Sequence, residues 1–197
     1  MASQRKVNLN ELNELGAPSA FIDVGPNAKA KLVGKPEVEE RVCGCLRFCW
    51  HVVYDPNTGD ATNRRKYLRA ALAEFASLDD AAQFDLGSAA PKMLALDDPA
   101  IHVVRLLRHA NVHLAASTLH GSHTPAIWQG PDGEQEFDYP LYVVPDIDAG
   151  IRGVRDAGKY GASDLSAMIT WIDREQKQWG IQNVVIRAAE RFLDRLP

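Results

Sequence analysis

Histidine and arginine gather in one short stretch, Arg108-His109-Ala110-Asn111-Val112-His113. Residues four apart lie on one face of a helix, so His109 and His113 share a face if this stretch is helical. His102 lies seven residues before His109, and Arg105 lies four before it, so both fall on the same stripe. The pattern predicts a cationic, titratable stripe along one helix.

Such a stripe suits the cleavage of a phosphodiester without a metal. That reaction needs one group to take the proton from a 2′-hydroxyl and another to protonate the leaving oxygen, and histidine can do either near neutral pH. It also needs a cation on the phosphoryl oxygens, and the planar fork of arginine matches phosphate. Arg108 lies toward the edge of the histidine face, within reach of it.

The same stretch, preceded by Leu106-Leu107, resembles the Arg-polar-x-x-x-His signature of HEPN domains (higher eukaryotes and prokaryotes nucleotide-binding). The resemblance implies a helical bundle and a metal-independent endoribonuclease of the toxin–antitoxin, abortive-infection or CRISPR kind. It also implies a homodimer in which two motif helices form one composite site. By this resemblance Arg108 and His113 are catalytic, and His109 fills the supporting polar position. We expect Arg105 and His102 to help bind the substrate.

The implied partners are therefore an RNA substrate, a second copy of the chain and a cognate antitoxin. An inert alternative remains open, in which the histidines hydrogen-bond to neighbouring helices. Arg108 would then pair with a carboxylate such as Asp97 or Asp98 from another chain or turn. The protein would then be a catalytically inert helical dimer that serves as a protein- or nucleotide-binding module.

A metal site is a further alternative, because His109 and His113 have the i, i+4 spacing of helical ligands. His102, His120 or His123 would then supply a third ligand, but no Glu follows His109 as in the zincin motif. We therefore predict neither a metal nor a cofactor.

The three cysteines, Cys43, Cys45 and Cys49, lie close together, with His51 nearby. Structural zinc sites draw on paired clusters of ligands, and the sequence has no second cysteine cluster. Cys45 and Cys49 fall on the apolar stripe of a predicted helix, where free cysteine behaves as a small hydrophobic residue. We expect them to be core residues.

The composition is that of an ordinary globular protein, with 197 residues, 46 % hydrophobic and 24 % charged. The net charge of −4 argues against a coat-like nucleic-acid binder but leaves room for a local positive site. No apolar run reaches the ~20 residues of a membrane helix, and residues 1–10 lack the apolar core of a signal peptide. We expect no membrane association and a cytoplasmic location.

Several elements must hold the motif in place. The predicted helices are 36–54, 62–77, 79–86, about 98–117, and a final segment, 163–196, with a kink or break near Trp179-Gly180. Alternation of apolar and polar residues predicts a β-hairpin near residues 126–144, and we expect His120 and His123 in a polar loop before it.

Residues 1–35 are rich in Gly and Pro and are expected to form an N-terminal arm, with a short helix over 8–15. Residues 36–197 are predicted to form a single helical domain that carries the hairpin insertion at 126–144. The predicted fold class is mainly α, a HEPN-like helical bundle with an inserted β-hairpin.

Overall fold

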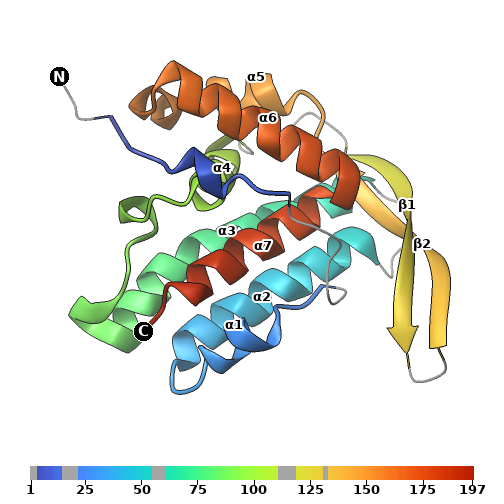
Figure 1. The fold of residues 1–197 in the computed structure, drawn as a ribbon, viewed down its shortest axis with the longest axis horizontal. Coiled ribbons are helices and arrows are strands. Elements are labelled where there is room, and N and C mark those ends of the chain that lie inside the picture. The colour runs from blue at the N-terminus through green and yellow to red at the C-terminus, as the bar shows by residue number, and fades with distance from the viewer. Residues whose placement is uncertain (1–3, 15–21, 55–60, 111–118, 131–132) are drawn as a thin grey trace.

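The structure is a computed structural model that describes residues 4–14, 22–54, 61–110, 119–130 and 133–197. Within these ranges the protein is a helical bundle with one inserted β-hairpin, which confirms the predicted fold class (Figure 1). The α-helices are α1 Pro26–Ala30, α2 Pro36–Val53, α3 Ala61–Leu86, α4 Pro99–Ala110, α5 Ile147–Arg152, α6 Ala162–Trp179 and α7 Ile181–Asp194. The strands are β1 His120–Gly130 and β2 Gly133–Val143, and the 3-10 turns are η1 Leu9–Glu11, η2 Gly87–Ala89, η3 Met93–Ala95 and η5 Arg155–Lys159.

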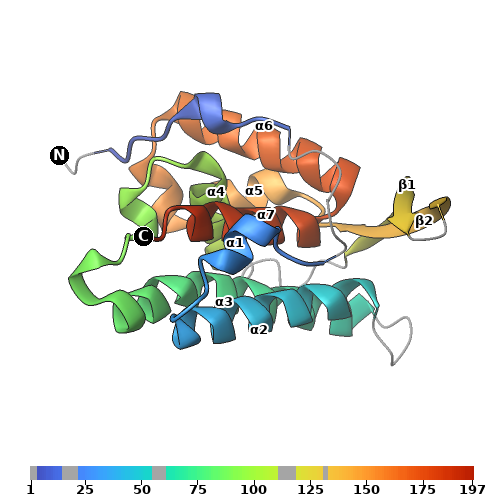
Figure 2. The ribbon, with the colours of Figure 1, turned by 60° about the horizontal axis from the view of Figure 1, so that its bottom comes forward.

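Helix α7 runs through the middle of the bundle. It packs on α2 and α3 on one side and on α6 on the other, and it also contacts α4 (Figure 2). Its predicted apolar positions are all buried: Ile181, Val184, Val185, Ala188 and Phe192. Because α7 is enclosed by neighbours on several sides, it also buries the polar residues Gln182 and Asn183.

Helices α2 and α3 form an antiparallel pair beneath α7 (Figure 2). The predicted apolar stripe of α2 is buried throughout: Val38, Val42, Cys45, Cys49 and Val52. Side chains of α3 satisfy the backbone groups at both ends of α2. Asp85 Oδ2 accepts from the Val38 amide (2.9 Å), and Arg64 Nη1 donates to the carbonyls of Val52 (2.6 Å) and Val53 (3.0 Å).

Helix α3 is continuous, so the prediction of two helices over 62–77 and 79–86 is wrong. Aspartate often caps the start of a helix, but Asp79 lies inside α3. Its carboxylate instead accepts from the Met93 amide (2.7 Å) and pairs with Arg105 (2.6 Å). The buried stripe continues past it through Leu78, Ala81 and Ala82, so packing favours one uninterrupted helix.

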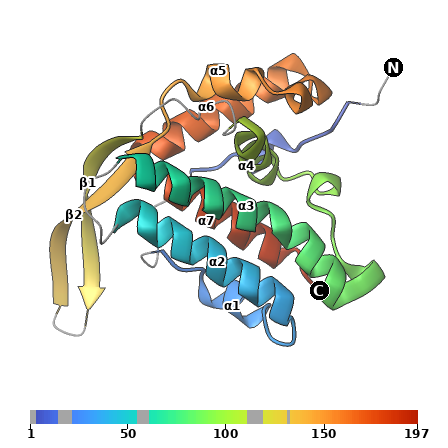
Figure 3. The ribbon, with the colours of Figure 1, turned by 180° about the vertical axis from the view of Figure 1, so that it is seen from behind.

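The hairpin is present, but its first strand begins earlier than predicted. The register pairs His120 with Val143 and Ala126 with Phe137, so the placement of His120 and His123 in a loop is wrong. Pairing with β2 extends β1 toward the N-terminus, beyond the residues whose alternation of apolar and polar side chains predicted the hairpin. The hairpin projects from the bundle beside the C-terminal end of α2 (Figures 1 and 3).

Contacts at the base of the hairpin anchor it to the bundle. Tyr139 and Leu141 are buried, and the Tyr139 hydroxyl accepts from Asn183 Nδ2 (3.2 Å). Gln176, also buried, accepts from the Val144 amide (2.9 Å) and donates to the Val144 carbonyl (3.1 Å). A two-stranded hairpin is marginal alone, so this anchored base stabilises it.

The predicted final helical segment, 163–196, breaks at Gly180, as the Trp179-Gly180 pair predicted. Gly180 has φ +82°, in the left-handed region that favours glycine, and it ends α6 and begins α7. A Cβ at this position would lie 2.4 Å from Gln182 Nε2. The change of direction therefore depends on glycine.

The N-terminal residues lie along the outside of α6 and α7 (Figure 1). The Asn8 amide donates to the Asp97 carbonyl (2.7 Å), and Trp171 Nε1 donates to the Asn13 carbonyl (2.9 Å). The short helix expected over 8–15 is reduced to the 3-10 turn η1, and the Gly- and Pro-rich part contains α1. Residue 15 lies outside the described residues.

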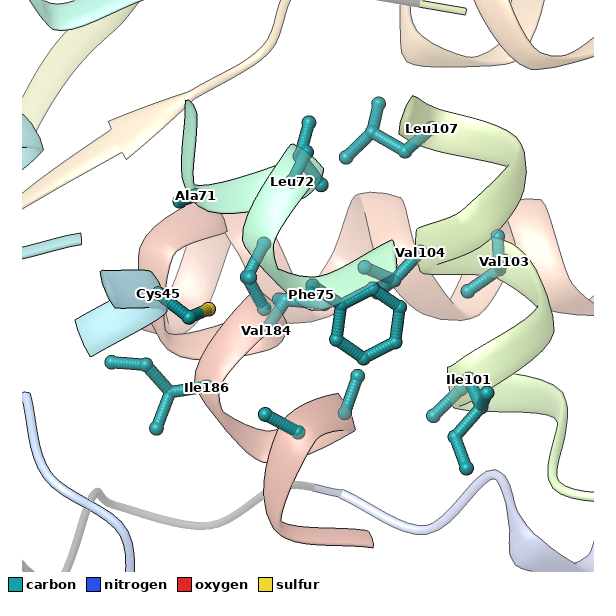
Figure 4. Packing of buried hydrophobic residues seen from close by; sticks show 14 of the residues in the cluster. Cys45, Ala71, Leu72, Phe75, Ile101, Val103, Val104, Leu107, Val184 and Ile186 are labelled. Atoms are coloured by element: carbon teal, nitrogen blue, oxygen red, sulfur yellow. The ribbon is translucent and has the colours of Figure 1, made fainter. Parts of the chain in front are cut away.

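Most helices contribute to one hydrophobic cluster. Figure 4 shows Cys45 of α2, Phe75 of α3, Val104 of α4 and Val184 of α7 within it, and each is almost fully buried. Among the described helices, none combines the length and apolar character of a membrane span.

Candidate functional site

Helix α4 begins at Pro99, as the Asp98-Pro99 pair predicted. Asp98 Oδ1 accepts from the amide of Ala100 (2.9 Å), as a capping carboxylate does, and Pro99 occupies the first helical position. Arg191 of α7 reaches the same carboxylate, with Nη1 3.4 Å from Oδ1. Apolar side chains surround much of the helix, so only part of its predicted polar stripe can reach solvent.

His102, a predicted substrate-binding residue, is 0 % exposed and has partners on both ring nitrogens. Nε2 lies 2.8 Å from the Leu96 carbonyl, and Nδ1 lies 2.9 Å from the Tyr160 hydroxyl. A carbonyl can only accept, so we assign the ring proton to Nε2 and a donated hydroxyl proton from Tyr160 to Nδ1. Burial lowers the pKa of His102, in agreement with this neutral form.

Arg105, the other predicted substrate-binding residue, bridges two elements. Its Nη1 lies 2.6 Å from Asp79 Oδ2 of α3 and 3.5 Å from Met93 Sδ of η3. Asp79 also accepts from the Met93 amide (2.7 Å), so the guanidinium closes a small network between α3, η3 and α4. In this geometry Arg105 joins helices together.

Arg108 and His109 lie in the last described turn of α4, and they are placed differently. Arg108 is exposed, and it has no hydrogen bond or ion pair to the residues that the structure describes. Within the chain, Asp98 accepts from the start of α4 and from Arg191, and Arg108 does not pair with it. A pairing of Arg108 with a carboxylate of another chain stays a prediction.

His109 is half-buried, and its pKa is lowered first by burial and then by the charge of Arg108. Asp156 acts in the opposite direction, and Arg105 and Lys159 add smaller lowering effects. The imidazole is therefore mainly neutral near pH 7, and it can accept a proton.

The structure thus places four of the five predicted residues on α4 and divides them. Arg108 and His109 lie together at the accessible end, whereas His102 and Arg105 are engaged by other elements. The fifth residue, His113, lies outside the described residues. Its role stays a prediction.

Sequence patterns missed a second set of residues that meet α4. Tyr160 follows η5, is buried, and connects His102 to Arg5, whose Nη1 lies 3.3 Å from the Tyr160 hydroxyl. Arg5 also pairs with Asp156 (3.8 Å), and Asp156 pairs with Lys159 (2.8 Å). These residues come from two segments that lie far from α4 in sequence, so no local spacing could have signalled them.

The cysteines lie where the sequence predicted. Cys45 and Cys49 are buried, and Cys43 is exposed. A hydrogen bond with Cys45 and burial both raise the pKa of Cys49, so its thiol stays protonated. The described residues contain no group of three or more His, Cys, Asp or Glu side chains that could hold a metal ion.

A scan against models of protein families, a search of curated proteins and a search of solved structures each gave no match for this chain.

Proposed function

We propose that the chain is a HEPN-like, metal-independent endoribonuclease whose reactive groups lie at the C-terminal end of α4. The observation that carries the proposal is the exposed guanidinium of Arg108, which has no partner among the described residues and lies in the same helical turn as the half-buried imidazole of His109. The other arginine of this helix is held by a carboxylate at 2.6 Å. Arg108 is thus the guanidinium on α4 that remains available to a phosphate.

The proposed reaction is an attack of the RNA 2′-oxygen on the adjacent phosphorus, with cleavage of the bond to the 5′-oxygen. One histidine takes the 2′-hydroxyl proton, and a second histidine or its copy in the partner protomer protonates the leaving 5′-oxygen. Arg108 balances the negative charge on the phosphoryl oxygens. By the HEPN resemblance His113 takes part in the proton transfers, His109 supports the site, and a homodimer brings two motif helices together.

A second candidate is the catalytically inert helical dimer that acts as a binding module. The specific observation in its favour is His102, because its buried and fully partnered ring is what the inert alternative expects of histidines between helices. It predicts a folded dimer without RNA cleavage. For the endoribonuclease, we also propose a cognate antitoxin as a partner and a cytoplasmic location.

Cleavage of a 5′-labelled single-stranded RNA in excess EDTA distinguishes the two candidates. We expect Arg108→Ala and His113→Ala each to lower the rate by roughly 100-fold or more, because each removes a group from the reaction. Arg47→Ala is the matched control, since Arg47 is an exposed arginine of α2, a helix that packs mainly on α3 and α7.

Circular dichroism and gel filtration verify that each variant keeps its fold and oligomeric state. The endoribonuclease proposal is overturned if Arg108→Ala and His113→Ala both cleave RNA at the wild-type rate. It is equally overturned if EDTA abolishes the activity.

A further inference from the structure

The N-terminal residues and η5 meet on the stripe of α4 that leads to the proposed catalytic end. The Arg5 amide donates to the Lys159 carbonyl (2.8 Å), and residues 5 and 160 form a parallel β-bridge. The Tyr160 hydroxyl then joins Arg5 to His102 of α4. Three segments that are far apart in sequence are therefore fixed to one another.

This junction extends from His102 toward His109. The two histidines are seven residues apart, which places them on one stripe about 10 Å apart along the helix axis. Asp156 and Lys159 both act electrostatically on His109. Because Tyr160 directly follows η5 and its hydroxyl contacts His102, η5 lies on the side of α4 that carries His102 and His109.

Positive charge exceeds negative charge at this junction, although the whole chain has a net charge of −4. The described residues that act on His109 or pair within the junction comprise four cationic side chains and two carboxylates: Arg5, Arg105, Arg108, Lys159, Asp79 and Asp156.

Lys159 is the cation best placed for a ligand apart from Arg108, since its side chain is 46 % exposed. Its carboxylate partner Asp156 is shared with Arg5. An exposed lysine whose partner is already divided between two cations can still attract a phosphate.

We propose that Arg5, Asp156 and Lys159 form a phosphate-binding subsite, the η5 subsite, for the backbone of single-stranded RNA next to the scissile phosphate. Lys159 contacts the phosphate, Arg5 offsets the charge of Asp156, and Asp156 limits the affinity. The inference rests on the proposed function, because it takes the end of α4 as the place of cleavage.

Fluorescence anisotropy with a labelled 2′-O-methyl oligouridine of about 12 nucleotides measures binding directly. This probe lacks the free 2′-hydroxyl, so the proposed reaction cannot cleave it. We expect Lys159→Gln to raise the Kd roughly fivefold and to reduce the slope of log Kd against log salt by about 0.7, the value of one phosphate contact on a single strand. We expect Asp156→Asn to lower the Kd.

The opposite signs of the two effects separate a subsite from a structural ion pair. If the pair only holds η5 in place, the two variants change the Kd in the same direction or leave it unchanged, and the η5 subsite is overturned. It is also overturned if the wild-type protein does not bind the probe.

Lys177 and Asp173 of α6 form a matched control pair, with Nζ 2.6 Å from Oδ2. They lie toward the end of α6 that is remote from η5, and Lys177→Gln and Asp173→Asn should change the Kd less than about twofold. Shifts as large as those of the η5 pair would indicate a general charge effect and overturn the subsite.

A parallel cleavage assay with unmodified RNA separates failure of the subsite from failure of the proposed function. Opposite Kd shifts without cleavage support phosphate binding by the η5 subsite, but they refute the endoribonuclease and with it the position of the subsite next to a scissile phosphate. Cleavage without the opposite shifts refutes the subsite alone.

Discussion

Removal of the Tyr160 hydroxyl tests the proton arrangement that we assign around His102. Tyr160→Phe keeps the ring that packs against His102 and beneath the Arg5 guanidinium. It leaves His102 Nδ1, which lies 2.9 Å from that hydroxyl, buried without a donor. A buried acceptor that loses its partner costs about 1–3 kcal/mol.

Arg5 adds little to this loss, because it keeps its ion pair with Asp156 and is partly exposed. For a chain of this size, 1 kcal/mol corresponds to a change in Tm of about 2–4 °C. We therefore expect Tyr160→Phe to lower the Tm by roughly 2–12 °C and to reduce the free energy of unfolding in urea without changing the m-value.

Tyr142→Phe is the matched control. The Tyr142 ring lies under Arg64, at 4.6 Å from centroid to Cζ, and its hydroxyl has no hydrogen bond to the described residues. This change should cost less than about 0.5 kcal/mol. If Tyr160→Phe is no more destabilising than Tyr142→Phe, the hydroxyl does not donate to His102 as assigned.

Two further changes test the bundle. The pKa of His102 is lowered from 6.5 in the folded protein. As the pH falls below about 7, the unfolded chain therefore binds more protons than the folded protein does. The free energy of unfolding should decrease as the pH is lowered from about 7.5 to 5.5. Urea unfolding at each pH tests this, and His102→Gln should reduce the slope; an unchanged slope would contradict the assignment. Gly180→Ala should cost about 1–3 kcal/mol, because its Cβ meets Gln182 in a left-handed conformation. Gly158→Ala is the control, because a Cβ at Gly158 would meet no atom within 4 Å. If Gly180→Ala lowers the Tm no more than Gly158→Ala does, the expected strain at Gly180 is contradicted.

Local signals predicted much of the fold correctly. The spacing of Val38, Val42, Cys45 and Cys49 defined the buried face of α2, and Asp98-Pro99 marked the start of α4. Both signals depend only on residues within a few turns of the same helix. Asp79 shows the limit of such signals, because a carboxylate that caps a helix and one that pairs across helices are the same residue type.

The candidate site was predictable only in part, for the same reason. Helical periodicity placed His102 and His109 on one face of a helix, and both residues lie in the α-helix α4. Periodicity does not report what lies against that face, and His102 is covered by Tyr160, 58 residues away in sequence. Arg5 lies 155 residues from the hydroxyl that it reaches. Burial and partners of this kind depend on the assembled bundle.

Cleavage of RNA at the end of α4 by attack of the 2′-hydroxyl requires that hydroxyl in the substrate. Wild-type protein and Arg108→Ala are incubated in EDTA with a labelled single-stranded RNA and with DNA of the same sequence. We expect cleavage of the RNA by the wild-type protein to a 2′,3′-cyclic phosphate, no cleavage of the DNA, and loss of the reaction in Arg108→Ala. Cleavage of both nucleic acids, or of neither, would contradict this mechanism.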